Sequence, residues 1–214
     1  MSTFTLTTLR DRCRVLGDYT RSSVITDAFL TEQVNDAIGE YSDLLDERWE
    51  GYRDTTGTIP TVANTATVAL PANFLKARAV DILDSDRYRP LERLQLRGIY
   101  RFENRTERPV GYLHVGTNLE LFPTPDAVYT IRLRYVPTAT VLVADADTID
   151  VPNGWEGFII HTALLKVDEK EERSLGDRLQ IIDRYRQRII NAAADRNTAE
   201  PEYLHIPGDI GGHW

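Results

Sequence analysis

The spacing of apolar residues changes twice along this 214-residue chain. Near both ends, apolar residues recur every three or four positions, which is the period of an amphipathic helix. Between about residues 52 and 151 they alternate with polar residues, which is the period of a strand with one covered face. We therefore predict an α+β fold, in which the N- and C-terminal helices form a helical bundle and an antiparallel β-rich module is inserted between them.

This pattern divides the chain into four expected parts. Residues 1–51 and 152–198 supply the helices of the bundle, and residues 52–151 form the β-rich module with a hairpin. Residues 199–214 form an extended C-terminal arm.

Two helices are expected in the first part. A short helix ends at Gly17, and a long one starts after Thr26, whose side chain suits an N-cap. The apolar side of the short helix comprises Leu6, Leu9, Cys13 and Leu16. The stripe of the long helix, which ends near Gly51, comprises Leu30, Val34, Ala37, Ile38, Tyr41, Leu44, Leu45, Arg48 and Trp49.

The β-rich module is predicted from four stretches. Strands are expected in "TATVALP", in "KARAVDIL", with Arg78, Val80 and Ile82 on one face, and in "YTIRLRYVP". A hairpin is expected in "PVGYLHVGTNLELFPTP", with its turn at residues 116–118. The last of these strands should have one covered face and one face that contacts water or a partner. The covered face comprises Tyr129, Ile131, Leu133 and Tyr135, and the other comprises Thr130, Arg132 and Arg134. A short helix is expected around residues 95–102.

Two further helices are expected after residue 151. The first has Pro152 in its first turn and ends in the acidic run at residues 168–172. The second is capped by Ser174. The first stripe comprises Trp155, Phe158, Ile159, Thr162, Leu165 and Lys166, and the second comprises Leu175, Leu179, Ile182, Arg186, Ile189 and Ala193.

Composition excludes several classes of protein. No stretch approaches the roughly eighteen apolar residues of a membrane helix, and the first residues lack the pattern of a signal peptide, so we expect a protein that folds in the cytoplasm. Cys13 is the single cysteine, which excludes an intrachain disulfide, and its position predicts a buried thiol. The formal net charge of −8 disfavours tight binding of nucleic acid.

No catalytic or metal-binding motif is predicted. One acidic stretch partly matches a calcium-binding loop, with Asp145, Asp147 and Glu156 at its first, third and twelfth positions. The match fails at the fifth position, where Ile149 offers no oxygen ligand, and at the sixth, where Asp150 stands in place of the required glycine. The four histidines have no metal-ligand spacing, and no GxSxG, GxxxxGK or GxGxxG motif occurs. We expect no enzyme, no cofactor and no metal.

Arginines crowd one segment of the β-rich module. Only three of the chain's 25 basic residues are lysines, and arginine is the cation that protein interfaces favour. The segment also holds aromatic residues, so it suits either a subunit interface or a nucleic-acid site, while nearby acids dilute its charge. The interface residues would be Arg87, Arg89, Arg93, Arg97 and Arg101.

The last fifteen residues, "EPEYLHIPGDIGGHW", cannot continue a helix because they hold two prolines and three glycines. They also carry large apolar side chains, whose exposure to water is unfavourable in free energy. Either this segment folds back on its own domain, or it is an arm for a partner. Its candidate anchors are Tyr203, Leu204, Ile206 and Trp214.

Several motifs together resemble the adaptor proteins of the head-to-tail connector of tailed bacteriophages. The stretch "ITDAFLTEQVNDAIGEYSDLL" is similar to their early Thr-Asp and Asn-x-Ala helix, and "VALPANFLKARAV" to their Leu-Pro start of the sheet. The stretch "RPVGYLHVGTNLELFPTP" resembles their hairpin, and "WEGFIIHTALLKVDEKEE" their aromatic-led helix. The order of these motifs covers most of the chain from Thr26 onwards.

The resemblance implies a structural virion protein of the neck, made in the host cytoplasm. Such adaptors form a dodecameric ring under the portal protein, extend the DNA channel without binding DNA specifically, and offer a docking surface to the stopper or tail-completion protein. Their C-terminal arm commonly docks into the portal. The alternatives are another neck or tail-completion protein, a carboxylate-based enzyme, or a nucleic-acid module centred on residues 87–108.

Overall fold

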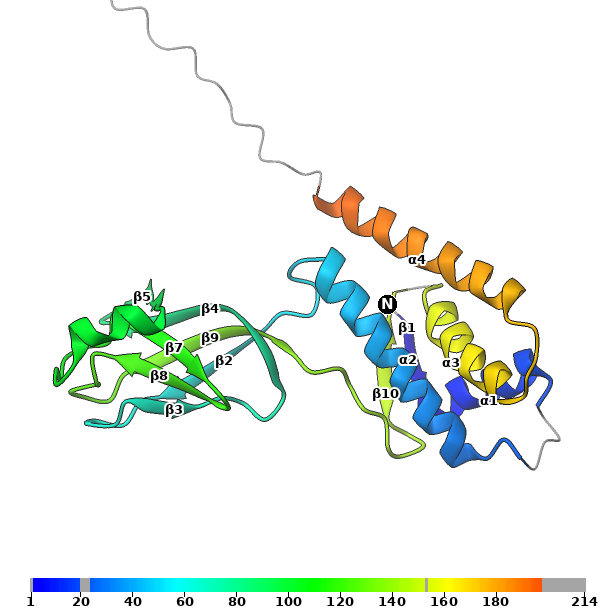
Figure 1. Ribbon diagram of the computed structural model, residues 1–214, viewed down its shortest axis with the longest axis horizontal. Helices are drawn as coiled ribbons and strands as arrows, with labels where there is room; N and C mark the ends of the chain where they lie inside the picture. Colours follow the sequence, from blue (N-terminus) through cyan, green and yellow to red (C-terminus); the bar gives the residue numbers. More distant parts are fainter. Residues whose placement is uncertain (1, 20–23, 153, 198–214) are drawn as a thin grey trace, which may run out of the picture. The chain divides into compact units, whose positions relative to one another are not determined.

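The computed structural model describes residues 2–19, 24–152 and 154–197 (Figure 1). The chain divides into two compact units. One consists of residues 1–37 and 143–214, and the other of residues 38–142. The predicted α+β class is confirmed, since helices and antiparallel sheets are both present. The predicted arm lies outside the described residues.

The first unit is helical, with one small sheet. It contains α1 (Leu6–Gly17), the first part of α2 (Asp27–Arg48), α3 (Glu156–Lys170) and α4 (Gly176–Asn197). Two strands, β1 (Ser2–Thr5) and β10 (Thr148–Val151), pair antiparallel with Ser2 opposite Val151. The periodicity did not predict these strands, because each is only four residues long.

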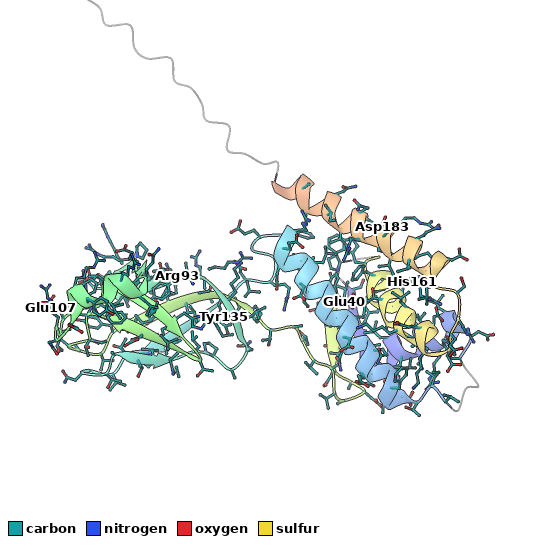
Figure 2. The ribbon with its side chains drawn as sticks, viewed as in Figure 1. Glu40, Arg93, Glu107, Tyr135, His161 and Asp183 are labelled. Carbon is teal, nitrogen blue, oxygen red and sulfur yellow. The ribbon has the colours of Figure 1, made fainter. Side chains whose placement is uncertain are left out.

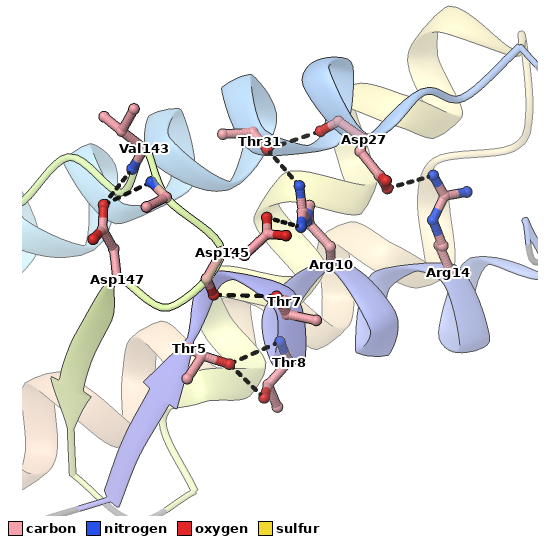
Figure 3. Close-up of polar contacts among 11 residues, drawn as sticks. Thr5, Thr7, Thr8, Arg10, Arg14, Asp27, Thr31, Val143, Asp145 and Asp147 are labelled. Carbon is pink, nitrogen blue, oxygen red and sulfur yellow. Dashed lines mark hydrogen bonds and ion pairs between the residues drawn. The ribbon is translucent and has the colours of Figure 1, made fainter.

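Local capping explains where α1 and α2 begin. Thr5 Oγ1 accepts a hydrogen bond from the backbone N–H of Thr8 at 3.1 Å (Figure 3). Thr26 Oγ1 accepts from the N–H of Phe29 at 3.2 Å, which confirms the predicted N-cap. At the other end of α1, Asp18 adopts a left-handed conformation with φ 58° and ends the helix.

The helices of the first unit bury most of the expected apolar positions. Leu6, Leu9 and Cys13 have no exposed area, and neither do Leu30 and Val34. Polar contacts tie the helices together: Arg10 and Arg14 of α1 reach Thr31 and Asp27 of α2 (Figure 3), and Lys166 of α3 pairs with Asp36 of α2 at 3.2 Å. The predicted helical bundle is therefore formed by elements from both ends of the chain.

Several predicted helix positions are wrong by one or more residues. Arg48 is exposed at the end of α2, and Pro152 precedes α3 instead of lying in its first turn. In α3 the predicted positions Phe158, Ile159 and Thr162 are buried, but Leu165 and Lys166 are only half-buried. The other buried residues of this helix are Ile160, Ala163, Leu164, Val167 and Asp168. Helix α4 begins at Gly176, beyond the predicted cap, and its Leu179 and Arg186 are exposed.

The second unit is a β-sandwich preceded by the rest of α2. One sheet has the order β2-β9-β4-β5, from β2 (Thr55–Pro60), β9 (Thr130–Pro137), β4 (Phe74–Asp84) and β5 (Arg87–Pro90). The other has the order β3-β8-β7-β6, from β3 (Thr67–Ala69), β8 (Asn118–Phe122), β7 (Gly111–Val115) and β6 (Glu92–Arg93). All pairs are antiparallel except the two-residue pair of β6 and β7, which is parallel.

One apolar core lies between the two sheets. It includes Val80 and Ile82 of β4, Leu119 and Leu121 of β8, and Ile131 of β9. The predicted covered face of β9 is confirmed, because Leu133 and Tyr135 are also in this core and Tyr129 packs against it. Alternate residues along these strands thus face the core between the two sheets, as the sequence pattern predicted.

Two details of the strands differ from the prediction. A register shift between Ala77 and Ala79 brings Ala77 against the core, and Arg78 instead pairs with Asp54 at 3.3 Å. The hairpin of β7 and β8 is confirmed, but its turn is shorter than predicted, because Asn118 already pairs with Val115. Gly116 occupies the turn with φ 58°. The expected short helix is a 3₁₀ helix, η1 (Leu96–Phe102).

Candidate functional site

The five predicted interface arginines lie on neighbouring short elements of the β-sandwich. They are on β5, at the edge of one sheet, on β6, at the edge of the other, and on η1. All five side chains are exposed, and Arg93 is labelled in Figure 2. We call the set Arg87, Arg89, Arg93, Arg97 and Arg101 the arginine surface.

Large apolar side chains accompany the arginine surface. Leu96 and Tyr100 are 69% and 66% exposed. Arg101 lies over the ring of Phe102, with 4.7 Å between the guanidinium carbon and the ring centroid, and pairs with Glu92 at 3.2 Å. Guanidinium groups beside exposed aromatic and aliphatic residues are typical of protein interfaces.

Two further acidic residues of this region form ion pairs with arginines. Asp84 contacts Arg89 at 2.8 Å and Arg108 at 2.5 Å. Asp81 accepts two hydrogen bonds from Arg132, from Nε at 2.9 Å and from Nη2 at 2.6 Å. The Arg132 guanidinium also lies 3.8 Å from the centroid of the Tyr88 ring. These pairs lower the net charge of the surface, which makes it a poorer match for nucleic acid than for a protein of mixed charge.

The helical unit carries a groove that the sequence pattern did not predict. It encloses about 650 Å³ and is lined by parts of α1, the start of α3 and α4. Val15 and Leu16 at its margin are 70% and 55% exposed. Leu16 was expected on the buried stripe of the first helix, and that expectation is wrong because the buried face of α1 continues from Cys13 to Gly17 and leaves Leu16 beside it.

A buried polar network joins three elements near this groove. Tyr19, which is 2% exposed, donates its hydroxyl hydrogen to Asp168 Oδ1 at 2.8 Å. Arg178 Nε of α4 donates to the other oxygen of Asp168, and Arg178 Nη1 lies 3.2 Å from His161 Nδ1. The Arg173 guanidinium covers the Tyr19 ring at 4.5 Å. The network therefore fastens the segment after α1 and the start of α4 to α3.

Electrostatics of the network favour neutral forms of its two aromatic members. Burial, aided by the hydrogen bond to Asp168, raises the pKa of Tyr19 to about 12. Burial and the charge of Arg178 lower the pKa of His161 below its ordinary value of 6.5. His161 also stacks on Tyr185 of α4, with 6.0 Å between ring centroids. The His161 side chain is half-buried, in keeping with a packing role.

The acidic stretch that resembled part of a calcium loop has another role. Asp147 Oδ2 accepts hydrogen bonds from the backbone N–H groups of Val143 and Ala144, both at 2.8 Å (Figure 3). These bonds lower the pKa of Asp147. Asp145 pairs with Arg10 at 2.5 Å. Among the described residues, no group of three or more His, Cys, Asp or Glu side chains is arranged to hold a metal ion.

The predicted arm anchors Tyr203, Leu204, Ile206 and Trp214 lie outside the described residues. Within the described ranges, no helix has both the length and the apolar content that crossing a membrane requires.

The fold is of the α+β class and carries two exposed features, the arginine surface and the groove of the helical unit. The model of the family described as SU10 adaptor protein matches residues 4–204, which is nearly the whole chain, and the chain belongs to this family. It is a bacteriophage adaptor protein, and the predicted resemblance to head-to-tail adaptors is confirmed. A comparison with curated proteins gave no match.

Proposed function

We propose that this adaptor forms a ring, dodecameric as the resemblance implies, under the portal protein of a tailed phage. In the virion neck the ring extends the DNA channel and provides the docking surface for the stopper or tail-completion protein. The observation that carries this proposal is the match of the adaptor family to residues 4–204. The protein has no enzymatic role in this proposal and is made in the host cytoplasm.

The arginine surface is assigned to contacts between neighbouring subunits of the ring. Its five guanidiniums are exposed, and its aromatic and aliphatic neighbours can be buried by a second chain. The rest of the chain is acidic, with a net charge of −8, so the copies offer carboxylates to these arginines. Such pairs fix the register of subunits in addition to any gain in affinity.

DNA passes through the ring without specific binding. An acidic protein repels phosphate, which lets DNA slide, whereas a basic channel would retain it through counterion release. The C-terminal arm contributes the attachment to the portal, with Tyr203, Leu204, Ile206 and Trp214 as anchors. Repetition around a ring converts weak arm contacts into tight attachment.

Binding to isolated portal rings tests the proposal. Full-length chain and a chain lacking residues 201–214 are mixed with portal and sedimented together. The full chain should co-sediment, and the shortened chain should remain in the supernatant with unchanged helix and sheet content by circular dichroism. Equal co-sedimentation of both chains would contradict the role of the arm, and failure of the full chain to bind would contradict the adaptor position.

A second pair of variants tests the arginine surface in the same assay. Arg97→Glu with Arg101→Glu should reduce the number of copies bound per portal, because it reverses charge at two exposed positions of the surface. Arg48→Glu with Arg186→Glu is the matched control, because both residues are exposed on helices outside the surface and the net charge changes by the same amount. An equal loss in both variants would assign the effect to net charge alone.

A further inference from the structure

The groove of the helical unit combines apolar side chains with a charged border. The charged lining residues are Asp11, Arg12, Glu156 and Arg188. Ile160, which is 2% exposed, lies beneath it, while Val15 and Leu16 stand at the edge of α1. Two adjacent aliphatic side chains that are more than half exposed beside a hollow are costly in water. A segment with large apolar side chains would remove this area from water.

Two glycines allow α4 to approach the start of α3 and so shape the groove. A β-carbon at Gly157 would overlap the ring of Tyr185, and one at Gly154 would lie 3.1 Å from the Arg188 guanidinium nitrogens. Gly154 also has φ 83°, which other residues rarely adopt. Tyr185 and Arg188 therefore form one wall of the groove, held by close backbone approach.

The same wall borders a second, smaller hollow. This hollow encloses about 290 Å³ and is lined by Ile181, Arg184, Tyr185 and Arg188. Arg184 and Arg188 thus place two guanidinium groups one helical turn apart, beside apolar surface. A matching ligand combines apolar side chains with nearby carboxylates.

We infer that the groove is the binding site of the C-terminal arm of its own chain before the adaptor meets the portal. The arm carries Tyr203, Leu204 and Ile206 directly after Glu200 and Glu202. Its apolar residues match the groove formed by Leu16, Ile160 and Tyr185, and Glu202, which directly precedes Tyr203, matches Arg188.

Chain length favours the arm of the same molecule as the occupant. Arg188 lies nine residues before the end of α4 at Asn197, a distance of about 14 Å at the helical rise of about 1.5 Å per residue. Six residues lead from Asn197 to Tyr203, and an extended chain of that length spans up to about 20 Å. Tyr203 can therefore return to the level of Arg188.

Because the arm belongs to the same chain as the groove, even a weak contact is sufficient to keep the arm bound. A short linker gives the arm an effective concentration in the millimolar range at its own groove. The inference rests on the proposed function in one respect: the portal would displace the arm, because many arms bind the portal ring together. The free subunit then hides both its apolar groove and its apolar arm until it reaches its partner.

A fluorescent peptide with the sequence of residues 200–214 tests this inference on full-length chains. The two chains compared are the natural one and an anchor variant with Tyr203→Ser, Leu204→Ser, Ile206→Ser and Trp214→Ser. Fluorescence anisotropy should show saturable binding to the anchor variant, whose groove is open. Binding to the natural chain should be weaker by about tenfold or more, because its own arm occupies the groove.

Substitutions at the groove locate the binding site. Leu16→Asp in the anchor variant should weaken peptide binding by about tenfold or more, since it places a carboxylate among the apolar contacts. Val62→Asp is the control, because Val62 is similarly exposed at 61% and lies outside the groove. If circular dichroism shows that Leu16→Asp lowers helix content, Leu16→Ser replaces it.

Three results would overturn the inference: equal affinity for the two chains, no binding to the anchor variant, or no effect of the Leu16 substitution. The assay contains no portal protein. Failure of the proposed function would therefore appear in the co-sedimentation assay alone, and failure of this inference in the peptide assay alone.

Discussion

The hydroxyl of Tyr19 donates a hydrogen bond to Asp168 Oδ1 across 2.8 Å, although 149 residues separate the two in sequence. Arg178 occupies the other oxygen of the same carboxylate. Asp168 is 3% exposed, so these two hydrogen bonds replace the contacts that its carboxylate would make with water. This carboxylate is the point at which the end of the first helix and the start of the last one are joined to α3.

Asp168→Asn should lower the free energy of unfolding by about 3–5 kcal/mol, because it leaves the half-buried Arg178 without its counter-charge. Urea denaturation followed by circular dichroism measures the change. Asp36→Asn is the control: Asp36 forms an exposed pair with Lys166, and its loss should cost about 1 kcal/mol or less. Similar losses for the two variants would show that the Asp168 network adds little stability.

Stability should decrease as the pH falls below 6.5, in part because of His161. Its pKa is lowered in the folded chain by burial and by Arg178, so below its ordinary value of 6.5 the unfolded chain binds more protons than the folded one. The contribution of His161 to this loss of stability continues until the pH reaches the pKa of His161 in the folded chain, and then stops. His161→Asn, which keeps an acceptor for Arg178, should flatten the stability profile in that window. An unchanged slope would mean that other groups cause it.

Gly157→Ala and Gly39→Ala should change stability in opposite directions. At position 157 the added β-carbon overlaps the Tyr185 ring, and such overpacking costs about 1–3 kcal/mol. At position 39, inside α2, nothing lies within 4 Å, and alanine should stabilise the helix by about 0.5–1 kcal/mol. Thermal unfolding of the two variants checks both signs. Stabilisation by Gly157→Ala would contradict the close approach of α4 to α3.

The Cys13 thiol should react slowly with a thiol reagent in the folded protein. It has no exposed area, and burial raises its pKa to about 12, so little thiolate forms near neutral pH. Val128→Cys provides a fast control, because Val128 is 69% exposed. Unfolding in guanidinium should make both thiols react at similar rates. Rapid labelling of Cys13 in the native chain would contradict its burial.

Features that depend on neighbours in sequence were predictable. The side chain of Thr26 caps the helix that follows it, and the alternation of Ile131 and Leu133 in β9 shows which face the second sheet covers. Both signals arise from local geometry, which residue type and spacing encode directly. The grouping of the arginines could also be predicted from the sequence, because these residues lie within one short segment.

Features that depend on contacts between distant segments were not predictable. Asp168 appeared as one member of an acidic run, and nothing near it in sequence indicates that Tyr19 and Arg178 bury it. Leu16 continues the apolar spacing of α1, but packing buries Gly17 in the same turn and leaves Leu16 exposed, which the spacing does not indicate. The pairing of β1 with β10 likewise joins two short segments from opposite parts of the chain.

Cryo-electron microscopy of the complete phage particle tests the central claim most directly. The account predicts a ring of this chain directly below the portal, with the segment from Tyr203 to Trp214 bound to portal subunits and the arginine surface between neighbouring copies. Density for this chain elsewhere in the particle, or its absence from the particle, would contradict the adaptor function.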